Sequence, residues 1–177
     1  MVKPQTKIGF WGYPNPEVVE KVKNQYPNSE WIDLDIDFSY PKTNILPESY
    51  CKIIRNIIDN VMYLKPEVIV APIGKDKCDS GWFASKILMD MGFNVIQTIF
   101  EDLEPKRDIR ICTSNLPLYD KVSTITGNII TPQSFETLPQ VKPSFGFWGV
   151  PPNDLEILRL FPDDTHVYGW MRCVEAG

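Results

Sequence analysis

The cysteines are the residues of this chain with the most distinctive chemistry. They are Cys51, Cys78, Cys112 and Cys173, and their spacing contains neither a CxxC pair nor a dense disulfide pattern. Reduced thiols are therefore expected. Thiolates bind zinc and iron–sulfur clusters, so we predict that Cys78, Cys112 and Cys173 hold a metal, either in an iron–sulfur cluster or as another metallocofactor. Cys51 is expected in the core, near the buried face of a helix.

Cys78 is also the best candidate for a catalytic thiol. The sequence predicts that a helix begins just after it, and Lys75 and Lys77 precede it. A helix N-terminus and nearby cations both favour the thiolate, whereas the neighbouring Asp79 opposes it. The alternative is a solvated loop whose cysteine has no role. We expect Cys78 to be the most reactive thiol of the protein, and to react before Cys51.

The run PEVIVAPIGKDKCDSGWFAS, which contains Cys78, resembles the cysteine loops of two-lobed, cofactor-independent racemases. The loop is longer than in those enzymes, and their Cys-Asn-Thr motif is absent. The resemblance implies an isomerase in which Cys78 transfers a proton.

Ligands of open parallel sheets bind at the carboxyl ends of the strands. Several residues of this chain are predicted to follow strands at that edge. The predicted ligand-binding residues are Trp11, Gly12, Lys75, Lys77, Asp79, Ser80, Thr113, Ser114, Asn115, Trp148 and Gly149. Neither GxGxxG nor GxxxxGK[ST] occurs, so the chain has no dinucleotide fingerprint and no P-loop.

Strand and helix patterns alternate along the chain. Asn15, Pro16 and Glu17 are typical of a helix start, and PEVIVAPIG is typical of a parallel strand buried on both faces. Further helices are expected for PEVVEKVKNQ, residues 50–62, about 82–91 and NDLEILRLF. Further strands are expected for KIGFWGY, SEWIDLDID, FNVIQTIF, RDIRICTSN, SFGFWGV and THVYGWMRC. The alternation predicts a three-layer α/β fold with a mainly parallel sheet.

The tetrapeptide GFWG occurs twice, at residues 9–12 and 146–149. We predict that residues 7–37 and 144–175 form equivalent βαβ units, with Trp11 and Trp148 in matching positions. The alternative is that one packing solution is used twice. The predicted organisation is a Rossmann-like domain over 1–115, a proline-punctuated connector over 116–143 and a partial second βαβ copy over 144–177. The second copy would pack on the same sheet or complete a second lobe. The most strand-like part of the connector is KVSTITGNIIT.

The net charge of −5 and the scattered basic residues exclude a nucleic-acid binder. No apolar run is long enough to span a bilayer, and the N-terminus lacks a signal-peptide core, so a cytoplasmic protein without membrane contacts is expected.

We therefore expect a small-ligand or metallocofactor binding protein. One alternative is a cysteine-dependent enzyme, an isomerase or a transferase, that uses Cys78 with Cys112 or Cys173. Another is a non-catalytic subunit of a larger assembly. A homo- or hetero-oligomer is expected because the partial second copy leaves apolar surface, unless residues 116–143 cover it. The residues expected there are Trp148, Val150, Val167, Tyr168 and Trp170.

Overall fold

The computed structural model of the protein describes residues 5–74, 77–99, 110–133, 137–170 and 172–173. The chain divides into an N-terminal unit, Met1–Glu101, and a C-terminal unit, Asp102–Gly177. The division lies before the boundary at residue 115 that the sequence predicts, so residues 110–115 belong to the C-terminal unit. Among the described residues, no helix has the length and apolar character needed to cross a membrane.

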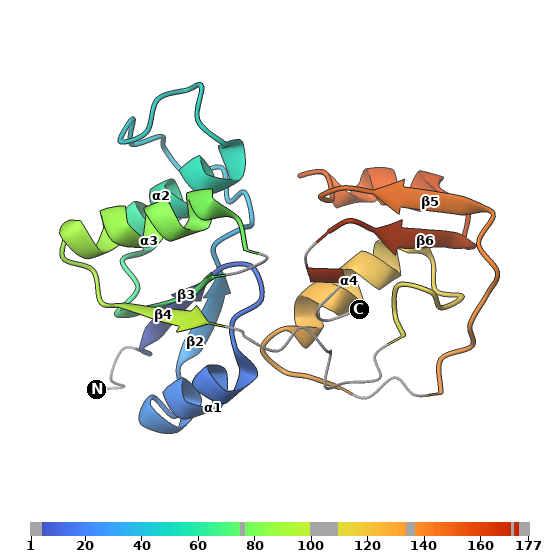
Figure 1. Cartoon of the computed structure of the whole chain (residues 1–177), viewed down its shortest axis with the longest axis horizontal. Helices are drawn as coiled ribbons and strands as arrows, with labels where there is room; N and C mark the ends of the chain where they lie inside the picture. Colours follow the sequence, from blue (N-terminus) through green and yellow to red (C-terminus); the bar gives the residue numbers. More distant parts are fainter. Residues whose placement is uncertain (1–4, 75–76, 100–109, 134–136, 171, 174–177) are drawn as a thin grey trace. The chain divides into compact units, whose positions relative to one another are not determined.

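The N-terminal unit is built on a sheet of four parallel strands (Figure 1). The strands are β1 (Lys7–Phe10), β2 (Glu30–Asp33), β3 (Val68–Ile73) and β4 (Val95–Ile99). Their order is β2-β1-β3-β4. Because the chain leaves β1 toward β2 and later returns to the other side of β1, a change of direction lies between β1 and β3.

Three helices cover this sheet. They are α1 (Pro16–Gln25), α2 (Lys52–Leu64) and α3 (Asp79–Asp90). Figure 1 shows α1 on one face and α2 with α3 on the other. The unit is therefore a three-layer α/β structure with an all-parallel sheet, as predicted.

Local sequence explains where these elements begin and how they pack. The Asn15 side chain accepts a hydrogen bond from the backbone N–H of Glu17 at 2.9 Å and caps α1. All six residues of β3 are buried, as expected of a central parallel strand. The apolar side of α2 packs with α3 over the sheet, and its most buried residues are Ile54, Ile57, Ile58 and Val61.

The described part of the C-terminal unit contains two helical segments and two strands with assigned bounds. They are α4 (Leu118–Asn128), β5 (Phe145–Trp148), the 3-10 helix η1 (Leu155–Leu160) and β6 (Thr165–Tyr168). β5 and β6 form a two-stranded parallel sheet, and α4 contacts η1 and β6.

Helix α4 lies in the segment that the sequence predicts as a proline-punctuated connector, and it includes most of KVSTITGNIIT, the part described as most strand-like. Leu118, Val122, Ile125 and Ile129 are all buried, and their spacing of three or four residues places them on one helix face. The β-branched residues of this segment have a high strand propensity, and that propensity made the segment look strand-like. The helical spacing of its buried residues decides the structure instead.

The strand predicted for RDIRICTSN is wrong over its described part, residues 110–115. These residues form a turn, and Ser114 makes a single antiparallel bridge to Gln140. Residues 107–109 lie outside the described part of the chain.

Both copies of GFWG begin a connection from one parallel strand to the next through a helical segment. In the first copy α1 joins β1 to β2, and in the second η1 joins β5 to β6. Their surroundings differ, because Trp11 is 4% exposed and Trp148 is 81% exposed. The internal repeat stays a prediction.

Candidate functional site

Two of the predicted thiols meet in the C-terminal unit. The thiol of Cys112 donates a hydrogen bond to the carbonyl oxygen of Cys173, with a distance of 3.4 Å. The side chains of the two residues also affect each other's pKa. Both residues are buried, although 61 positions separate them in the chain. Cys78 belongs to the N-terminal unit.

The elements that hold the pair differ from the predicted strand ends. Cys112 lies in a turn, and its carbonyl oxygen accepts a hydrogen bond from the backbone N–H of Val167 in β6 at 3.3 Å. Cys173 lies in a helical turn after β6, and its N–H donates to the carbonyl oxygen of Trp170 at 2.9 Å. Gly169, with a φ of 74°, reverses the chain between strand and turn.

The two thiols have opposite pKa shifts. The hydrogen bond from Cys112 lowers the pKa of Cys173 to about 7, and backbone hydrogen bonds assist it against the opposing effect of burial. The same hydrogen bond raises the pKa of Cys112, and burial adds to the increase. These shifts make Cys173 the more acidic thiol of the pair and Cys112 the less acidic one.

A buried lysine of α4 lies beside this pair. Lys121 is fully buried, and its Nζ donates to the carbonyl oxygens of Thr165 at 2.7 Å and Asp163 at 3.3 Å. Burial lowers the pKa of Lys121, while the nearby Cys112 raises it. In return, the Lys121 charge lowers the pKa of Cys112, against the larger effects that raise it.

Lys121 was not predicted as a site residue from the sequence, because lysine is rarely fully buried. A signal was nevertheless present. Lys121 lies three residues after Leu118 and four before Ile125, on the apolar face of a helical pattern. This signal was overlooked because the segment was interpreted as a connector with strand-like character.

The residues after Cys112 pair with a neighbouring segment. Val141 donates its N–H to the carbonyl oxygen of Thr113 at 3.1 Å, and Asn115 donates to that of Pro139 at 3.0 Å. The Thr113 side chain is hydrogen-bonded to Gln140. Ser114 is buried, and its hydroxyl donates to the carbonyl oxygen of Ile111 at 2.8 Å. These contacts hold the turn that carries Cys112, so Thr113, Ser114 and Asn115 support the thiol site.

At the carboxyl edge of the N-terminal sheet, the loop after β1 is held from two sides. Gly12, with a φ of 55°, donates its N–H to Asp35 at 2.8 Å. On the other side, Asn15 donates its side-chain N–H to the carbonyl oxygen of Ile99 at 3.2 Å. Trp11 is part of the core, and a Cβ added at Gly81 would lie 3.3 Å from its indole nitrogen. Trp11 thus packs against the start of α3.

Cys78 lies just before α3, where the sequence places it, and it is exposed. Asp79 and Ser80 form the first turn of that helix, and Lys77 donates its N–H to the carbonyl oxygen of Gly74 at 3.1 Å. Lys75 lies outside the described residues.

The prediction that Cys51 is in the core is wrong. Cys51 is the N-cap residue of α2 and is exposed, because it precedes the first turn of the helix instead of lying on its apolar face.

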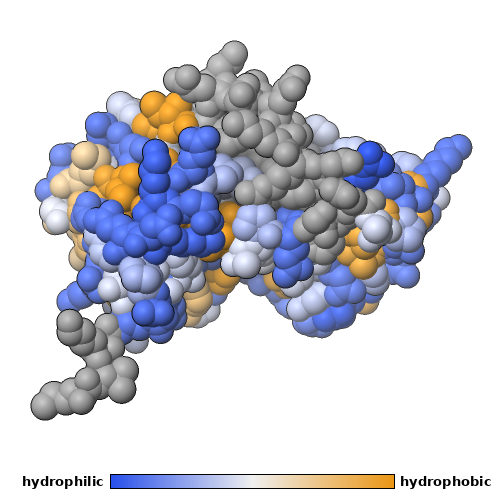
Figure 2. All heavy atoms as spheres, turned by 90° about the horizontal axis from the view of Figure 1, so that it is seen from below, coloured by the Kyte–Doolittle hydropathy of each residue, from blue (hydrophilic) through white to orange (hydrophobic). Residues whose placement is uncertain are grey.

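On the sheet of the C-terminal unit, Trp148 is exposed, and Gly149 donates its N–H to the carbonyl oxygen of Tyr168 at 3.1 Å. Val150 and Tyr168 are exposed as well, as expected for the predicted apolar surface, whereas Val167 is buried. Val167 was misassigned because β6 is buried along its first three residues and only Tyr168, at its end, is exposed. Elsewhere, the face of the molecule drawn in Figure 2 is largely hydrophilic, with separate apolar patches.

No group of three or more His, Cys, Asp or Glu side chains that could hold a metal ion occurs among the described residues. No known protein family, no curated protein and no solved structure matches the chain.

Proposed function

We propose that the protein exchanges thiols and disulfides, with Cys112 and Cys173 as a redox-active pair. The observation that carries this proposal is the buried, hydrogen-bonded pair with opposite pKa shifts. Thiol–disulfide exchange needs a thiolate as attacking group and a second thiol that resolves the intermediate. Cys173, with a pKa of about 7, suits the first role, and the protonated Cys112 beside it suits the second.

The reaction with a small disulfide balances without a further reactant. The Cys173 thiolate attacks one sulfur of the disulfide, forms a mixed disulfide and releases the other sulfur as a thiolate, which takes the proton that Cys173 lost. Cys112 then loses its proton and attacks the Cys173 sulfur. The second small thiol leaves with that proton. Two electrons pass from the protein pair to the small disulfide, and the protein keeps a Cys112–Cys173 disulfide.

The positive charge of Lys121 supports the second step. Cys112 must become a thiolate to resolve the mixed disulfide, and a nearby cation favours that form. The lysine is held by two backbone carbonyls, so its charge stays in place while the thiols react.

The predicted iron–sulfur cluster fits these residues less well. Such clusters are held by four thiolates, and the pair supplies two. The other two cysteines, Cys51 and Cys78, are both in the N-terminal unit. Metal binding by the pair is therefore one of the outcomes that the experiment below distinguishes.

The test uses the full chain with Cys51→Ser and Cys78→Ser, so that only the pair can react. Incubation with glutathione disulfide near neutral pH should remove both free thiols and leave a protein lighter by two hydrogen atoms. Adding Cys112→Ser should trap glutathione on Cys173, because the resolving thiol is absent. Adding Cys173→Ser instead should slow the reaction by about tenfold or more, since burial still raises the pKa of the remaining Cys112 thiol.

Equal rates for the two single-cysteine proteins, or a stable double adduct with no intramolecular disulfide, would contradict the proposal. Metal analysis of the protein purified without oxygen provides the other arm. Stoichiometric iron or zinc that is released when the pair is alkylated would favour the metallocofactor hypothesis over the redox pair.

A further inference from the structure

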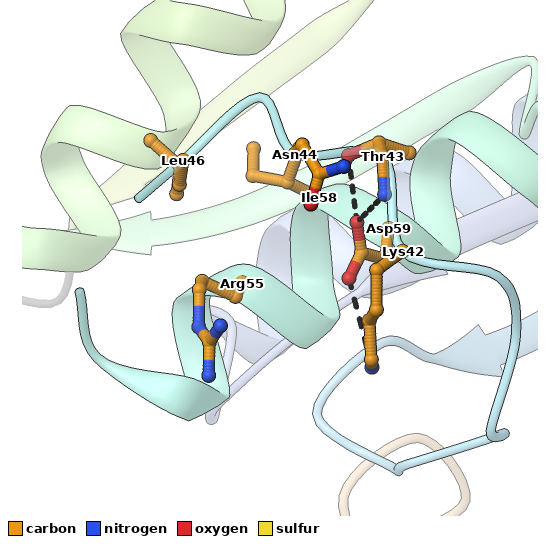
Figure 3. A pocket seen from close by; sticks show the side chains of 7 residues that line it. All are labelled: Lys42, Thr43, Asn44, Leu46, Arg55, Ile58 and Asp59. Atoms are coloured by element: carbon orange, nitrogen blue, oxygen red, sulfur yellow. Dashed lines mark hydrogen bonds and ion pairs between the residues drawn. The ribbon is translucent and has the colours of Figure 1, made fainter. Parts of the chain in front are cut away.

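A depression in the N-terminal unit lies between α2 and the loop that joins β2 to α2. It encloses about 240 Å³, counting its opening to solvent. The side chains around it are shown in Figure 3 and are those of Lys42, Thr43, Asn44, Leu46, Arg55, Ile58 and Asp59. None of these residues belongs to the thiol site.

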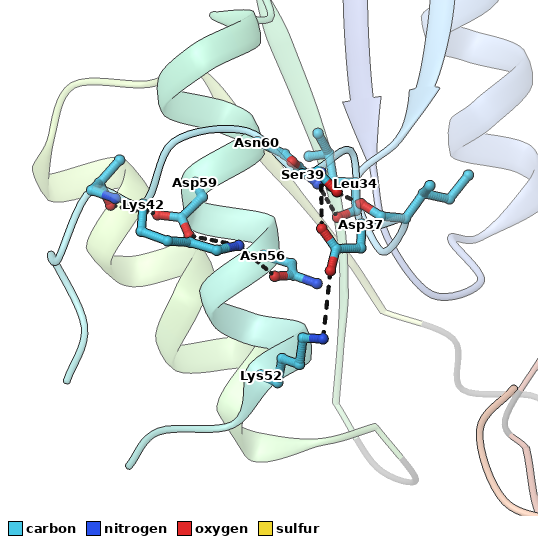
Figure 4. A network of polar contacts seen from close by, with 10 residues as sticks. Leu34, Asp37, Ser39, Lys42, Lys52, Asn56, Asp59 and Asn60 are labelled. Atoms are coloured by element: carbon cyan, nitrogen blue, oxygen red, sulfur yellow. Dashed lines mark hydrogen bonds and ion pairs between the residues drawn. The ribbon is translucent and has the colours of Figure 1, made fainter. Parts of the chain in front are cut away.

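Polar side chains of α2 hold the loop that forms one wall (Figure 4). Asn60 is buried, and its side chain donates to the carbonyl oxygens of Leu34 at 2.9 Å and Ile36 at 2.8 Å. Asp59 accepts two hydrogen bonds on one oxygen, from the N–H of Thr43 at 2.9 Å and from its hydroxyl at 2.6 Å. The wall is thus fixed before any ligand arrives.

The charge of Asp59 is already compensated. The Nζ of Lys42 lies 3.6 Å from the second carboxylate oxygen of Asp59 and donates to Asn56 at 3.3 Å. Arg55 precedes Asp59 by four residues on the same helix, a spacing at which the two side chains would ordinarily pair. Thr43 and Lys42 occupy the carboxylate instead.

Arg55 is consequently left without an acidic partner. Its Nε is buried and has no hydrogen-bond partner, and its guanidinium makes no ion pair within the described part of the chain. A buried donor without an acceptor costs about 1–3 kcal/mol. Figure 3 shows Arg55 on one side of the depression and Lys42 with Asp59 on the other. An acceptor bound between them would satisfy the guanidinium.

We propose that this depression binds a small organic or inorganic anion through Arg55. Two cations and one carboxylate line it, so it carries a net positive charge. A guanidinium binds carboxylates and phosphates through two parallel hydrogen bonds. Leu46 and Ile58 add apolar surface. The space is small, about 240 Å³ even with its opening to solvent counted, so the ligand is a short-chain carboxylate or a small phosphate.

The test follows the Arg55 Nε–H resonance of the full chain by ¹H–¹⁵N NMR while butyrate or inorganic phosphate is added at constant ionic strength. Sodium chloride is the control for general salt effects. We expect saturable shifts of the Nε–H and of the amides of residues 43–46, at millimolar concentrations of one of the two anions. A response to butyrate alone identifies a carboxylate site, and a response to phosphate alone identifies a phosphate site.

Arg55→Gln should weaken binding by about tenfold or more, and Arg55→Lys should recover only part of it, because lysine lacks the planar fork. The matched control is Lys52→Gln. Lys52 is an exposed cation of the same helix that pairs with Asp37 at 3.5 Å, outside the depression. Its variant should bind as the unaltered protein does.

The proposal is overturned if neither anion shifts the Nε–H more than chloride does, or if Lys52→Gln weakens binding as much as Arg55→Gln. The wild-type titration decides the question even if Arg55→Gln does not fold.

Discussion

The two GFWG stretches are identical in sequence and differ in what surrounds them. Trp11 is 4% exposed and belongs to the core of the N-terminal unit, whereas Trp148 is 81% exposed. Strand β1 pairs with β2 on one side and with β3 on the other, between layers of helices. Strand β5 pairs with β6 alone among the described strands. Burial of this tetrapeptide is therefore decided by the neighbouring strands and helices.

The two units differ in the polar groups that they bury. The N-terminal unit buries Asn56, Asp59 and Asn60 of α2 beside an apolar cluster beneath α2 and α3. The interior of the C-terminal unit contains Lys121, Thr165 and His166, whose Nε2 lies 2.9 Å from the carbonyl oxygen of Val141. A small unit with few strands buries less apolar surface, and hydrogen bonds between buried groups organise this one. The same buried polar surroundings shift the pKa values of the thiol pair.

The largest difference in stability between the two tetrapeptides is expected when their tryptophans are replaced by alanine. Trp11→Ala should destabilise the N-terminal unit by about 3–5 kcal/mol, because it leaves a cavity beside Gly81 and Ala84. Trp148→Ala should cost less than about 1 kcal/mol. Urea unfolding, followed by amide exchange in peptides from each unit, measures both. Similar losses in the two variants would show that Trp148 is covered in solution, as a partner chain would cover it.

Substitution of the first glycine of each tetrapeptide should have a smaller effect. A Cβ on Gly9 would lie 2.8 Å from Cδ1 of the fully buried Leu34 and 3.3 Å from Pro66. Gly9→Ala should therefore cost about 1–3 kcal/mol. A Cβ on Gly146 would meet only the ring of Tyr168, at 3.2 Å, and that ring lies at the surface, where it can shift more easily than a core side chain. Gly146→Ala should change stability by less than about 0.5 kcal/mol. Thermal unfolding of both variants tests this, and an equal loss for Gly146→Ala would contradict it.

The elements that the sequence predicted correctly are those whose signals are local. The cap at Asn15, the apolar face of α2 and the continuous apolar run of β3 each depend on a few adjacent residues. The start of α3 just after Cys78 was also predicted from its capping residues. Helix α4 was missed because its β-branched residues favour a strand, although their spacing is helical.

The thiol site could be predicted only in part. Cys112 and Cys173 were expected to meet at strand ends, and they meet through a turn and a helical turn beside β6. Contacts between residues so far apart depend on the packing of the whole unit, which leaves no local pattern. The Arg55 depression was missed for a similar reason. The guanidinium of Arg55 lacks an acidic partner because Thr43 and Lys42, in the loop that joins β2 to α2, contact Asp59.

The smallest expected effect is a pH dependence that should appear in the C-terminal unit and be absent from the apolar N-terminal core. The pKa of Cys173 is about 7 in the folded protein and about 8.5 in an unfolded chain. Between these values the unfolded state binds more protons, so the free energy of unfolding should rise with pH. This contribution is complete above the unfolded value and is lost as the pH falls through 7.

The slope cannot exceed about 1.4 kcal/mol per pH unit, the value for one proton. Urea unfolding of the Cys51→Ser, Cys78→Ser protein from about pH 6 to about pH 8 measures it. Adding Cys173→Ser should flatten the curve for peptides of β6 and leave those of β3 unchanged. An unaltered slope in that variant would mean that the pKa of Cys173 is not lowered, and the thiol pair would then lack its attacking group.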